Sequence, residues 1–345
     1  MAMVDITIRG AGIFGLSIAW ACVKRGAKVQ IIDPHGAGSG SSGGIVGALA
    51  PHVPENWNPK KAFQLDSLLM AGQFWADVEN TCGGCAGYIR SGRLQPIMEE
   101  AGMTLAKRRS ETARTLWQGK ATWVVEECDQ NPWQPNSPTG WVIRDNLSAS
   151  LHPLKACEAL VAALAAKGVS VEADGIDTGR TLWATGVHGL EHLGRDRARN
   201  VGSGVKGQAA LLRFDAWGAP QLFADALHII PHLDGTVAVG STSENTFDDP
   251  RSVDAQIDGI ISRARVAVPL LRDAPVVQKW AGVRPRSRSR APMLGHWPDR
   301  RDHFIANGGF KIGFGMAPKI AQVMADLLLE DLNRIPQGFE VSASF

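Results

Sequence analysis

A glycine-rich turn between a strand and a helix is the feature that most constrains the fold of this chain. The segment GAGIFG, with Gly10, Gly12 and Gly15, follows the strand-like VDITIR and precedes LSIAWACVKRG and KVQIID. This order predicts a βαβ unit. Glycine at these positions permits a tight turn and lets the backbone approach a pyrophosphate, while the helix N-terminus supplies amide donors. The turn therefore predicts a dinucleotide-binding site that includes Ile13 and Phe14.

Asp33 stands at the end of the second strand of this unit. A carboxylate at that position accepts hydrogen bonds from the ribose hydroxyls of an adenosine and disfavours a 2′-phosphate. FAD and NAD share this half of a binding site, so the turn and the acid leave the choice of dinucleotide open. The alternative is an unrelated βαβ unit in which Asp33 is a surface turn residue, and it requires strand, glycines, helix and acid to coincide by chance.

Length and composition describe a globular chain without a strong electrostatic preference. The 345 residues favour two domains, and 36 basic and 34 acidic residues give a net charge of +2. This balance disfavours nucleic acid and anionic membranes as partners, so a small molecule is expected, and a homo-oligomer is compatible with the sequence. Five cysteines suggest a reducing compartment, and no secretory or membrane-spanning pattern is visible. A cytoplasmic protein is the expectation.

The remaining pattern predicts a second domain inserted into the first. Helices are expected from Lys60 onward, after His152-Pro153 and near Val253 to Ala267, and strand-like runs between Lys206 and Pro285 predict an antiparallel sheet. The fold class is therefore α/β, a Rossmann-like βαβ domain with an inserted α+β substrate domain. We predict that residues 1–85, 145–205 and 285–345 form the dinucleotide-binding domain, and residues 86–144 and 206–284 the substrate domain.

Four segments together resemble the D-amino-acid oxidase superfamily of FAD enzymes, in particular its glycine oxidase and sarcosine oxidase branch. They are GAGIFG with Asp33, the loop GSGSSGGIVGALAP, the turn TLWATG, and the C-terminal NGGFKIGFGMAP. The resemblance implies a glutathione-reductase-like FAD-binding domain. Beyond the first segment it assigns these residues to the cofactor: Ser41, Ser42, Gly43, Gly44, Thr185, Gly186, Gly309, Phe310, Lys311, Ile312 and Gly313. Read alone, the Ser/Gly loop also fits a flexible surface linker.

The resemblance further implies that FAD is held without a covalent bond. Sarcosine oxidases attach FAD through a cysteine close to the C-terminal turn, and other relatives use a histidine in the serine-rich loop. Neither residue occupies those places in this sequence.

Arg284, in WAGVRP, resembles the family arginine that grips the substrate carboxylate. A planar guanidinium holds a carboxylate with two parallel hydrogen bonds. Lys311 resembles the sarcosine oxidase lysine near the flavin, and it is a second carboxylate contact, a charge near the flavin edge, or a side chain that points to solvent. His228 stands where relatives carry an active-site tyrosine, although a lone histidine on a strand is more often structural. His52 is a weaker candidate near the ring face.

Arg284 has an alternative interpretation as one of a solvated row, because Arg284, Arg286, Arg288 and Arg290 alternate along one predicted strand. The family prefers an acidic residue shortly after the proline of this motif, and RSRSRAP departs from that preference. Cys82 and Cys85 have the spacing of a metal or redox pair, but without a second pair they are expected to be reduced thiols, and no metal is predicted.

The implied reaction is oxidation of the C–N bond of a small amino acid or secondary amine by hydride transfer to flavin N5. Burial keeps the amine neutral, so no general base is nominated. Dioxygen is the expected acceptor, which gives hydrogen peroxide. Three alternatives stay open: an amine dehydrogenase with another acceptor, an FAD domain acting on a tRNA wobble-uridine adduct, and a flavin-free interaction protein.

Overall fold

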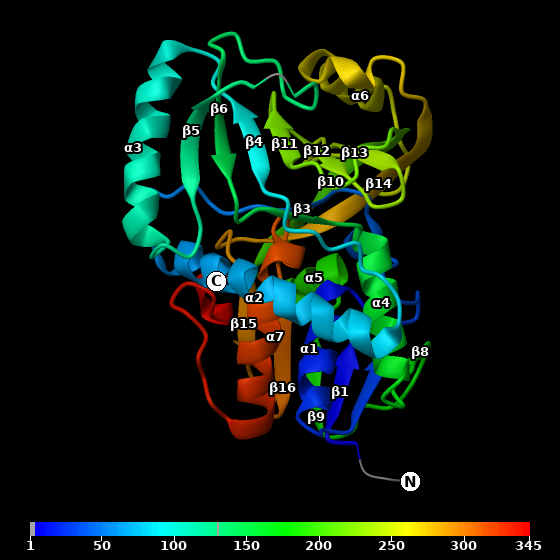
Figure 1. The fold of residues 1–345 in the computed structure, drawn as a ribbon. Helices are drawn as coiled ribbons and strands as arrows, with labels where there is room; N and C mark the ends of the chain where they lie inside the picture. The colour runs from blue at the N-terminus through cyan, green and yellow to red at the C-terminus, as the bar shows by residue number, and fades with distance from the viewer. Residues whose placement is uncertain (1–3, 130) are drawn as a thin grey trace.

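Two main sheets with helices on their faces make up the molecule (Figure 1). The structure is a computed structural model and describes residues 4–129 and 131–345. The six-stranded sheet lies in the lower half of Figure 1 and the eight-stranded sheet in the upper half. None of the helices in the described part of the chain combines the length and the apolarity that a membrane span requires.

The six-stranded sheet has the order β15-β16-β9-β1-β2-β8. Its strands are mostly parallel, since β1 pairs in parallel with β2 and β9, and β9 with β16, whereas β15 is an antiparallel edge strand. Ile6 and Ile8 of β1 and Thr7 between them are all buried, as expected for a parallel strand covered on both faces. The strand bounds are β1 Ile6–Arg9, β2 Val29–Ile32, β8 Val171–Glu172, β9 Arg180–Trp183, β15 Met293–His296 and β16 His303–Asn307.

Two helices pack against this sheet, α1 Ile13–Lys24 and α7 Gly313–Glu330, and two more, α2 Pro59–Cys82 and α4 Pro153–Ala165, pack on those helices and on each other. They surround the largest apolar core, which includes Leu16, Trp75, Leu160 and Met324. A smaller core joins α5 (Gly186–Asp196) to Met293, Trp297 and Ile305 of the same sheet region. A separate short sheet consists of β3 Gly47–Leu49 and β7 Ala149–Leu151. The chain also has three 3-10 turns in its described part, η1 Ser41–Gly43, η2 Pro269–Leu271 and η3 Val341–Ser344.

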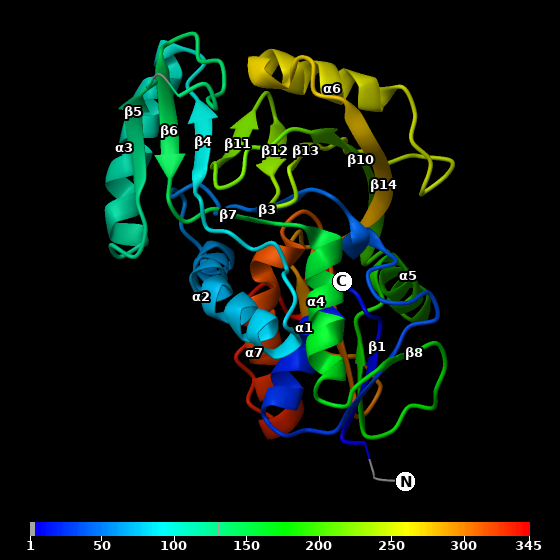
Figure 2. The ribbon, with the colours of Figure 1, turned by 45° about the vertical axis from the view of Figure 1, so that its right-hand side comes forward.

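The eight-stranded sheet has the order β14-β10-β13-β12-β11-β4-β6-β5 and is almost entirely antiparallel. One face packs on α6 (Gln256–Ala267), as Figure 2 shows. The opposite face packs on Ile45 and Val46 of the Ser/Gly loop. Helix α3 (Glu100–Leu116) lies beside β5. The strand bounds are β4 Arg93–Pro96, β5 Trp123–Glu127, β6 Trp141–Asp145, β10 Gly202–Arg213, β11 Gln221–Ala224, β12 Leu227–Pro231, β13 Thr236–Gly240 and β14 Val276–Ser287.

The helices expected from the pattern form at α2, α4 and α6, and Gly235 closes the β12–β13 hairpin with a φ of +75°. Helix α7 begins at Gly313 and contains Pro318 in its second turn. The eight-stranded sheet draws its strands from residues 93–145 and 202–287. The predicted domain boundaries near 85, 145, 205 and 285 stay predictions.

Candidate functional site

The first glycine turn has no room for side chains. Gly10 has a φ of +105°, and a Cβ at this position would lie 2.4 Å from the backbone oxygen of Ala184. A Cβ at Gly15 would lie 1.9 Å from the oxygen of Gly10. Helix α1 therefore begins close against the end of β1, and it has no acidic residue in its first turn. Its N-terminal amides and dipole suit an anion such as a pyrophosphate.

The Ser/Gly loop packs on this turn, which contradicts its interpretation as a flexible linker. Ser42 is buried, and its Oγ accepts a hydrogen bond from Ile13 N at 3.0 Å. A Cβ at Gly12 would lie 3.1 Å from the same hydroxyl. Gly43 passes so close to Gly38 that a Cβ would lie 2.2 Å from the Gly38 oxygen. Ser41, Ser42, Gly43 and Gly44 are thus fixed beside the start of α1.

Asp33 lies at the carboxyl end of β2, and both of its carboxylate oxygens are oriented by backbone amides. Oδ2 accepts from Ala11 N at 2.8 Å, and Oδ1 accepts from His35 N at 2.9 Å. Each oxygen keeps a further lone pair. The carboxylate therefore stands beside the glycine turn in an orientation suited to ribose hydroxyls.

The turn after β9 lies at the same edge of the six-stranded sheet. Asn307, the last residue of β16, donates from Nδ2 to the oxygen of Gly186 at 2.8 Å and accepts from Gly308 N at 2.7 Å. A Cβ at Gly189 would lie 2.5 Å from the Thr185 hydroxyl oxygen. Since β1, β9 and β16 run in parallel, their turns meet at one carboxyl edge, where sheets of this type bind ligands.

The C-terminal glycine turn packs directly on the first one. A Cβ at Gly309 would lie 2.8 Å from Cζ of Phe14, and one at Gly313 would lie 3.7 Å from Cγ2 of Ile13. Ile312 precedes α7 as its N-cap residue. Two segments about 300 residues apart in the sequence thus pack against each other. This arrangement of glycines and helix N-termini fits a dinucleotide.

Arg284 lies on β14 and points across the face of the eight-stranded sheet that is turned toward these glycine turns. Its Nη2 donates to Ser241 Oγ at 2.7 Å, and its Nη1 donates to the oxygen of Thr242 at 3.4 Å. No carboxylate among the described residues pairs with it within 4.0 Å. Burial lowers the pKa of Arg284 to about 10, with Glu244 acting in the opposite direction. The guanidinium is therefore charged at neutral pH, and its two partners are neutral.

Two glycines make room for this arginine and for Trp280. A Cβ at Gly207 of β10 would lie 2.1 Å from Nη1 and Nη2 of Arg284. A Cβ at Gly282 would lie 2.4 Å from the Trp280 ring, and a Cβ at Gly44 would lie 3.4 Å from the same ring. Trp280 thus joins the Ser/Gly loop to the strand that carries Arg284. Gly207 and Ser241 were missed in the sequence, although a glycine inside a strand-like run signals close approach.

His228 lies on β12 opposite Gly240, and its Nδ1 has no hydrogen-bond partner among the described residues. Burial, followed by the charges of Arg93, Lys311 and Arg284, lowers the pKa of His228 to about 3. The imidazole is therefore neutral at neutral pH. The charges of Arg93, Lys311 and Arg284 thus act on the same imidazole, although they come from different strands and turns. The sequence did not single out Arg93.

Arg93 is buried and donates from Nε to Asp145 Oδ2 at 3.0 Å. The Asp145 carboxylate also accepts from Leu147 N and Ser148 N. Arg93 is thus neutralised by a hydrogen-bonded partner. Arg284 differs from it in having no such partner.

Lys311 is exposed and lies over the Phe310 ring, with Nζ 5.7 Å from the ring centre. Partial desolvation of the ammonium and the nearby Arg284 lower its pKa. Phe310 itself has a φ of +44°, and its N–H donates to the oxygen of Pro285 at 3.0 Å. This bond connects the C-terminal turn to β14, the strand of Arg284.

The arginine row does not continue as a solvated strand face. Strand β14 ends at Ser287, so Arg288 and Arg290 lie beyond it and are exposed. Arg286 donates from Nη2 to Asn245 Oδ1 at 3.1 Å and lies over the Phe310 ring. Of the four arginines in the row, only Arg284 and Arg286 therefore lie on the inner face of the strand.

His52 is held by Gln64, a buried residue of α2. The Oε1 of Gln64 accepts from His52 N at 2.8 Å and also contacts His52 Nδ1. Burial lowers the pKa of His52, opposed by the bond to Gln64. The structure gives no contact between His52 and Arg284, so its proposed place near a ring face stays a prediction.

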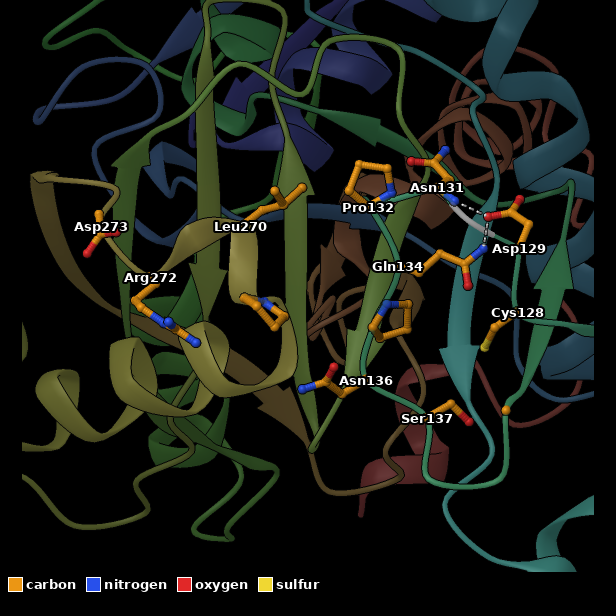
Figure 3. A pocket seen from close by; sticks show the side chains of 13 residues that line it. Cys128, Asp129, Asn131, Pro132, Gln134, Asn136, Ser137, Leu270, Arg272 and Asp273 are labelled. Carbon is orange, nitrogen blue, oxygen red and sulfur yellow. Dashed lines mark hydrogen bonds between the residues drawn. The ribbon is translucent and has the colours of Figure 1, made fainter.

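A surface hollow lies away from this site. It has a volume of about 550 Å³ and is formed by the loop between β5 and β6 and by η2, at the upper end of the eight-stranded sheet (Figures 1 and 3). Its lining includes Cys128, Pro132, Asn136 and Leu270, and it shares no residue with the site described above. Within residues 4–129 and 131–345, no three His, Cys, Asp or Glu side chains gather as metal ligands.

Comparison with known proteins gives a family match over most of the chain. A family model described as DAO, FAD dependent oxidoreductase, matches residues 5–327. The bifunctional protein ThiO/ThiG of Nostoc sp. is 26% identical over 94% of this chain and 53% of that protein. The glycine oxidase of Bacillus licheniformis is 25% identical over 94% of this chain and 93% of that protein. This chain thus spans about half the length of the first curated relatives.

A solved structure confirms the predicted fold class. The crystal structure of glycine oxidase from Geobacillus kaustophilus superposes with a TM-score of 0.83 over 98% of both chains, at 22% sequence identity. At that identity the likeness concerns the fold. The α/β architecture with an antiparallel second sheet is therefore shared with this class of structures.

Proposed function

We propose, because the chain belongs to the DAO family of FAD-dependent oxidoreductases, that it oxidises the C–N bond of a small amino acid or secondary amine. The relatives named glycine oxidase support this substrate class. The observation that carries the proposal is Arg284, a partly buried guanidinium whose only hydrogen-bond partners in the described chain are the hydroxyl of Ser241 and the oxygen of Thr242. Such a cation is suited to a carboxylate ligand.

The glycine turns would hold the FAD without a covalent bond. Gly10, Gly12 and Gly15 allow the turn to pack closely at the start of α1, the first amides of α1 would donate to the pyrophosphate, and Asp33 would accept from the adenosine ribose. The turn of Gly309 to Gly313 would face the other half of the cofactor. When bound, FAD supplies the acceptor for the hydride that leaves the substrate carbon.

The charges around Arg284 favour a neutral substrate amine. Arg284 and Lys311 are cationic and His228 is neutral, so an ammonium group placed among them loses hydration and gains no carboxylate partner. Both effects lower the pKa of the amine. We therefore propose that these residues position the substrate and favour its reactive form, and that no side chain acts as a general base.

Dioxygen is the acceptor we propose for reoxidation, with hydrogen peroxide as product. The five cysteines, all free thiols in the structure, support a reducing compartment such as the cytoplasm. A homo-oligomer is compatible with this proposal.

The test uses the purified protein with FAD. A flavin absorption spectrum that remains with the protein on gel filtration is expected, together with peroxide release from glycine, sarcosine or a D-amino acid. Amines without a carboxylate should be poor substrates. Reduction of a dye acceptor without peroxide release would indicate a dehydrogenase. Absence of flavin binding, or salt-sensitive tRNA binding with no turnover of free amino acids, would contradict the proposal.

A further inference from the structure

The sequence Cys82-Gly83-Gly84-Cys85 forms a turn that the proposed reaction does not use. Helix α2 ends at Cys82, and Gly83 follows with a φ of +66°, a left-handed conformation that reverses the chain. The Gly83 N–H donates to the oxygen of Glu79 at 2.8 Å. Both cysteines are free thiols, with Cys85 exposed and Cys82 partly buried.

The backbone of the turn contacts the sulfur of the first cysteine. Gly84 N donates to Cys82 Sγ at 3.2 Å, so the residue immediately before Cys85 already touches the Cys82 sulfur. A Cβ at Gly84 would lie 3.3 Å from that sulfur, and glycine leaves this side open. The Cys85 sulfur is oriented by Gly87 N at 3.3 Å.

The turn is also fixed to the body of the protein. Ala86 N donates to Glu79 Oε1 at 2.7 Å, and His152 N donates to the Ala86 oxygen at 3.4 Å. His152 is the N-cap residue of α4. The two thiols therefore stand on a rigid support between two helices, which limits the number of arrangements that they sample.

We propose that Cys82 and Cys85 form a peroxide-reactive dithiol that closes to an intramolecular disulfide. The exposed Cys85 sulfur attacks one peroxide oxygen, the O–O bond breaks, and a sulfenic acid and one water form. The Cys82 sulfur then attacks the Cys85 sulfur, the S–S bond forms, and the hydroxyl leaves as a second water. Two thiols lose two electrons, and one hydrogen peroxide is reduced to two waters.

The oxidant is hydrogen peroxide, which the proposed oxidase reaction releases, so the source of the oxidant rests on the proposed function. The chemistry of the turn does not depend on that function, because added hydrogen peroxide serves equally well. The remaining cysteines provide internal controls. Cys22 and Cys157 are fully buried, and burial raises the pKa of each thiol to about 12. Thiols of this kind react poorly with peroxide.

The experiment treats the reduced, full-length protein with hydrogen peroxide, then alkylates the free thiols and maps peptides by mass spectrometry. The peptide with Cys82 and Cys85 should lose two hydrogen atoms, escape alkylation, and recover both thiols after reduction with dithiothreitol. Cys85→Ser should abolish the loss, whereas Cys128→Ser should leave it unchanged. Independent alkylation of both cysteines after treatment, or their conversion to sulfinic and sulfonic acids without a disulfide, would overturn the proposal.

A second sample contains the protein, FAD and an amine substrate, with and without catalase. Disulfide formation that catalase prevents links the dithiol to turnover. If added peroxide closes the disulfide and substrate does not, the dithiol stands and the oxidase function is contradicted. If substrate releases peroxide and the cysteines remain reduced, the oxidase function stands and the dithiol proposal is wrong.

Discussion

The guanidinium of Arg284 occupies the space that a side chain at Gly207 would need. A Cβ at Gly207 would lie 2.1 Å from both Nη atoms and 2.3 Å from Cζ. The two residues lie on neighbouring strands, since Gly207 pairs with Gly282, two residues before Arg284. The direction of the guanidinium is therefore set by a missing side chain on β10 as well as by the Ser241 hydroxyl on the other side.

Gly207→Ala should displace the guanidinium, because flexible side-chain atoms give way before the backbone of two paired strands does. We expect KM for a carboxylate substrate to rise about tenfold, which corresponds to about 1.4 kcal/mol of lost binding. FAD binding should be unchanged. Steady-state kinetics give KM, and the flavin content of the purified variant checks FAD binding. Gly259→Ala on α6 is the matched control, because nothing lies within 4 Å of a Cβ there.

Arg284→Ala should remove the proposed carboxylate contact itself. We expect kcat/KM for an amino-acid substrate to fall roughly a hundredfold or more, about 2.7 kcal/mol of transition-state stabilisation. Arg284→Lys should recover only a small part, because an ammonium cannot make two parallel hydrogen bonds. Kinetic measurements with an amino acid and with its decarboxylated amine make the comparison. Equal losses for both substrates would show that Arg284 supports the fold and does not bind the carboxylate.

The sequence was sufficient for the parts of the site that are local. Gly10, Gly12, Gly15 and Asp33 belong to one βαβ unit of about thirty residues, so strand, turn, helix and acid are read together. The fold class follows from the same unit and from the strand-like runs after Lys206. These features depend on neighbours in the chain, and periodicity reports such neighbours well.

The parts that sequence reasoning missed depend on strand order. Arg93 comes near His228 because β4 pairs with β11, which in turn pairs with β12, and nothing in a single sequence gives that order. Gly207 looked like any glycine in a strand until β10 was placed beside β14.

Asp33→Asn tests the proposed ribose contact. The amide oxygen still accepts from Ala11 N, so the glycine turn should keep its shape, but the charge and one acceptor for the ribose hydroxyls are lost. We expect FAD to bind about tenfold more weakly, because hydrogen bonds to an ionised acceptor are roughly twice as strong as neutral ones. Titration of the apoprotein followed by flavin fluorescence gives the affinity. Asp5→Asn is the control, since Asp5 accepts from Lys28 N in a similar way away from the turn. Equal effects of the two substitutions would contradict the ribose assignment.

The burial of His232 predicts how the free energy of unfolding changes with pH. It is buried, its ring centre lies 4.8 Å from that of His152, and its Nε2 has no partner among the described residues. Burial, then the neighbouring His152, lowers the pKa of His232 to about 3, with Asp234 acting in the opposite direction. In the unfolded chain the same group titrates near its ordinary value of 6.5.

Between these two pKa values the unfolded state binds a proton that the folded state excludes. The contribution of His232 is therefore fully present above pH 6.5 and is lost as the pH falls toward 3, by at most about 1.4 kcal/mol per pH unit. Denaturant unfolding between pH 7 and pH 4.5 should show a shallower loss of stability for His232→Gln than for the natural sequence, because glutamine has no proton to gain. His188→Gln, at a side chain that is 83% exposed, should leave the slope unchanged. If His232→Gln and the natural protein lose stability in parallel, the imidazole takes up its proton equally in the folded and unfolded states, and the buried, neutral assignment is wrong.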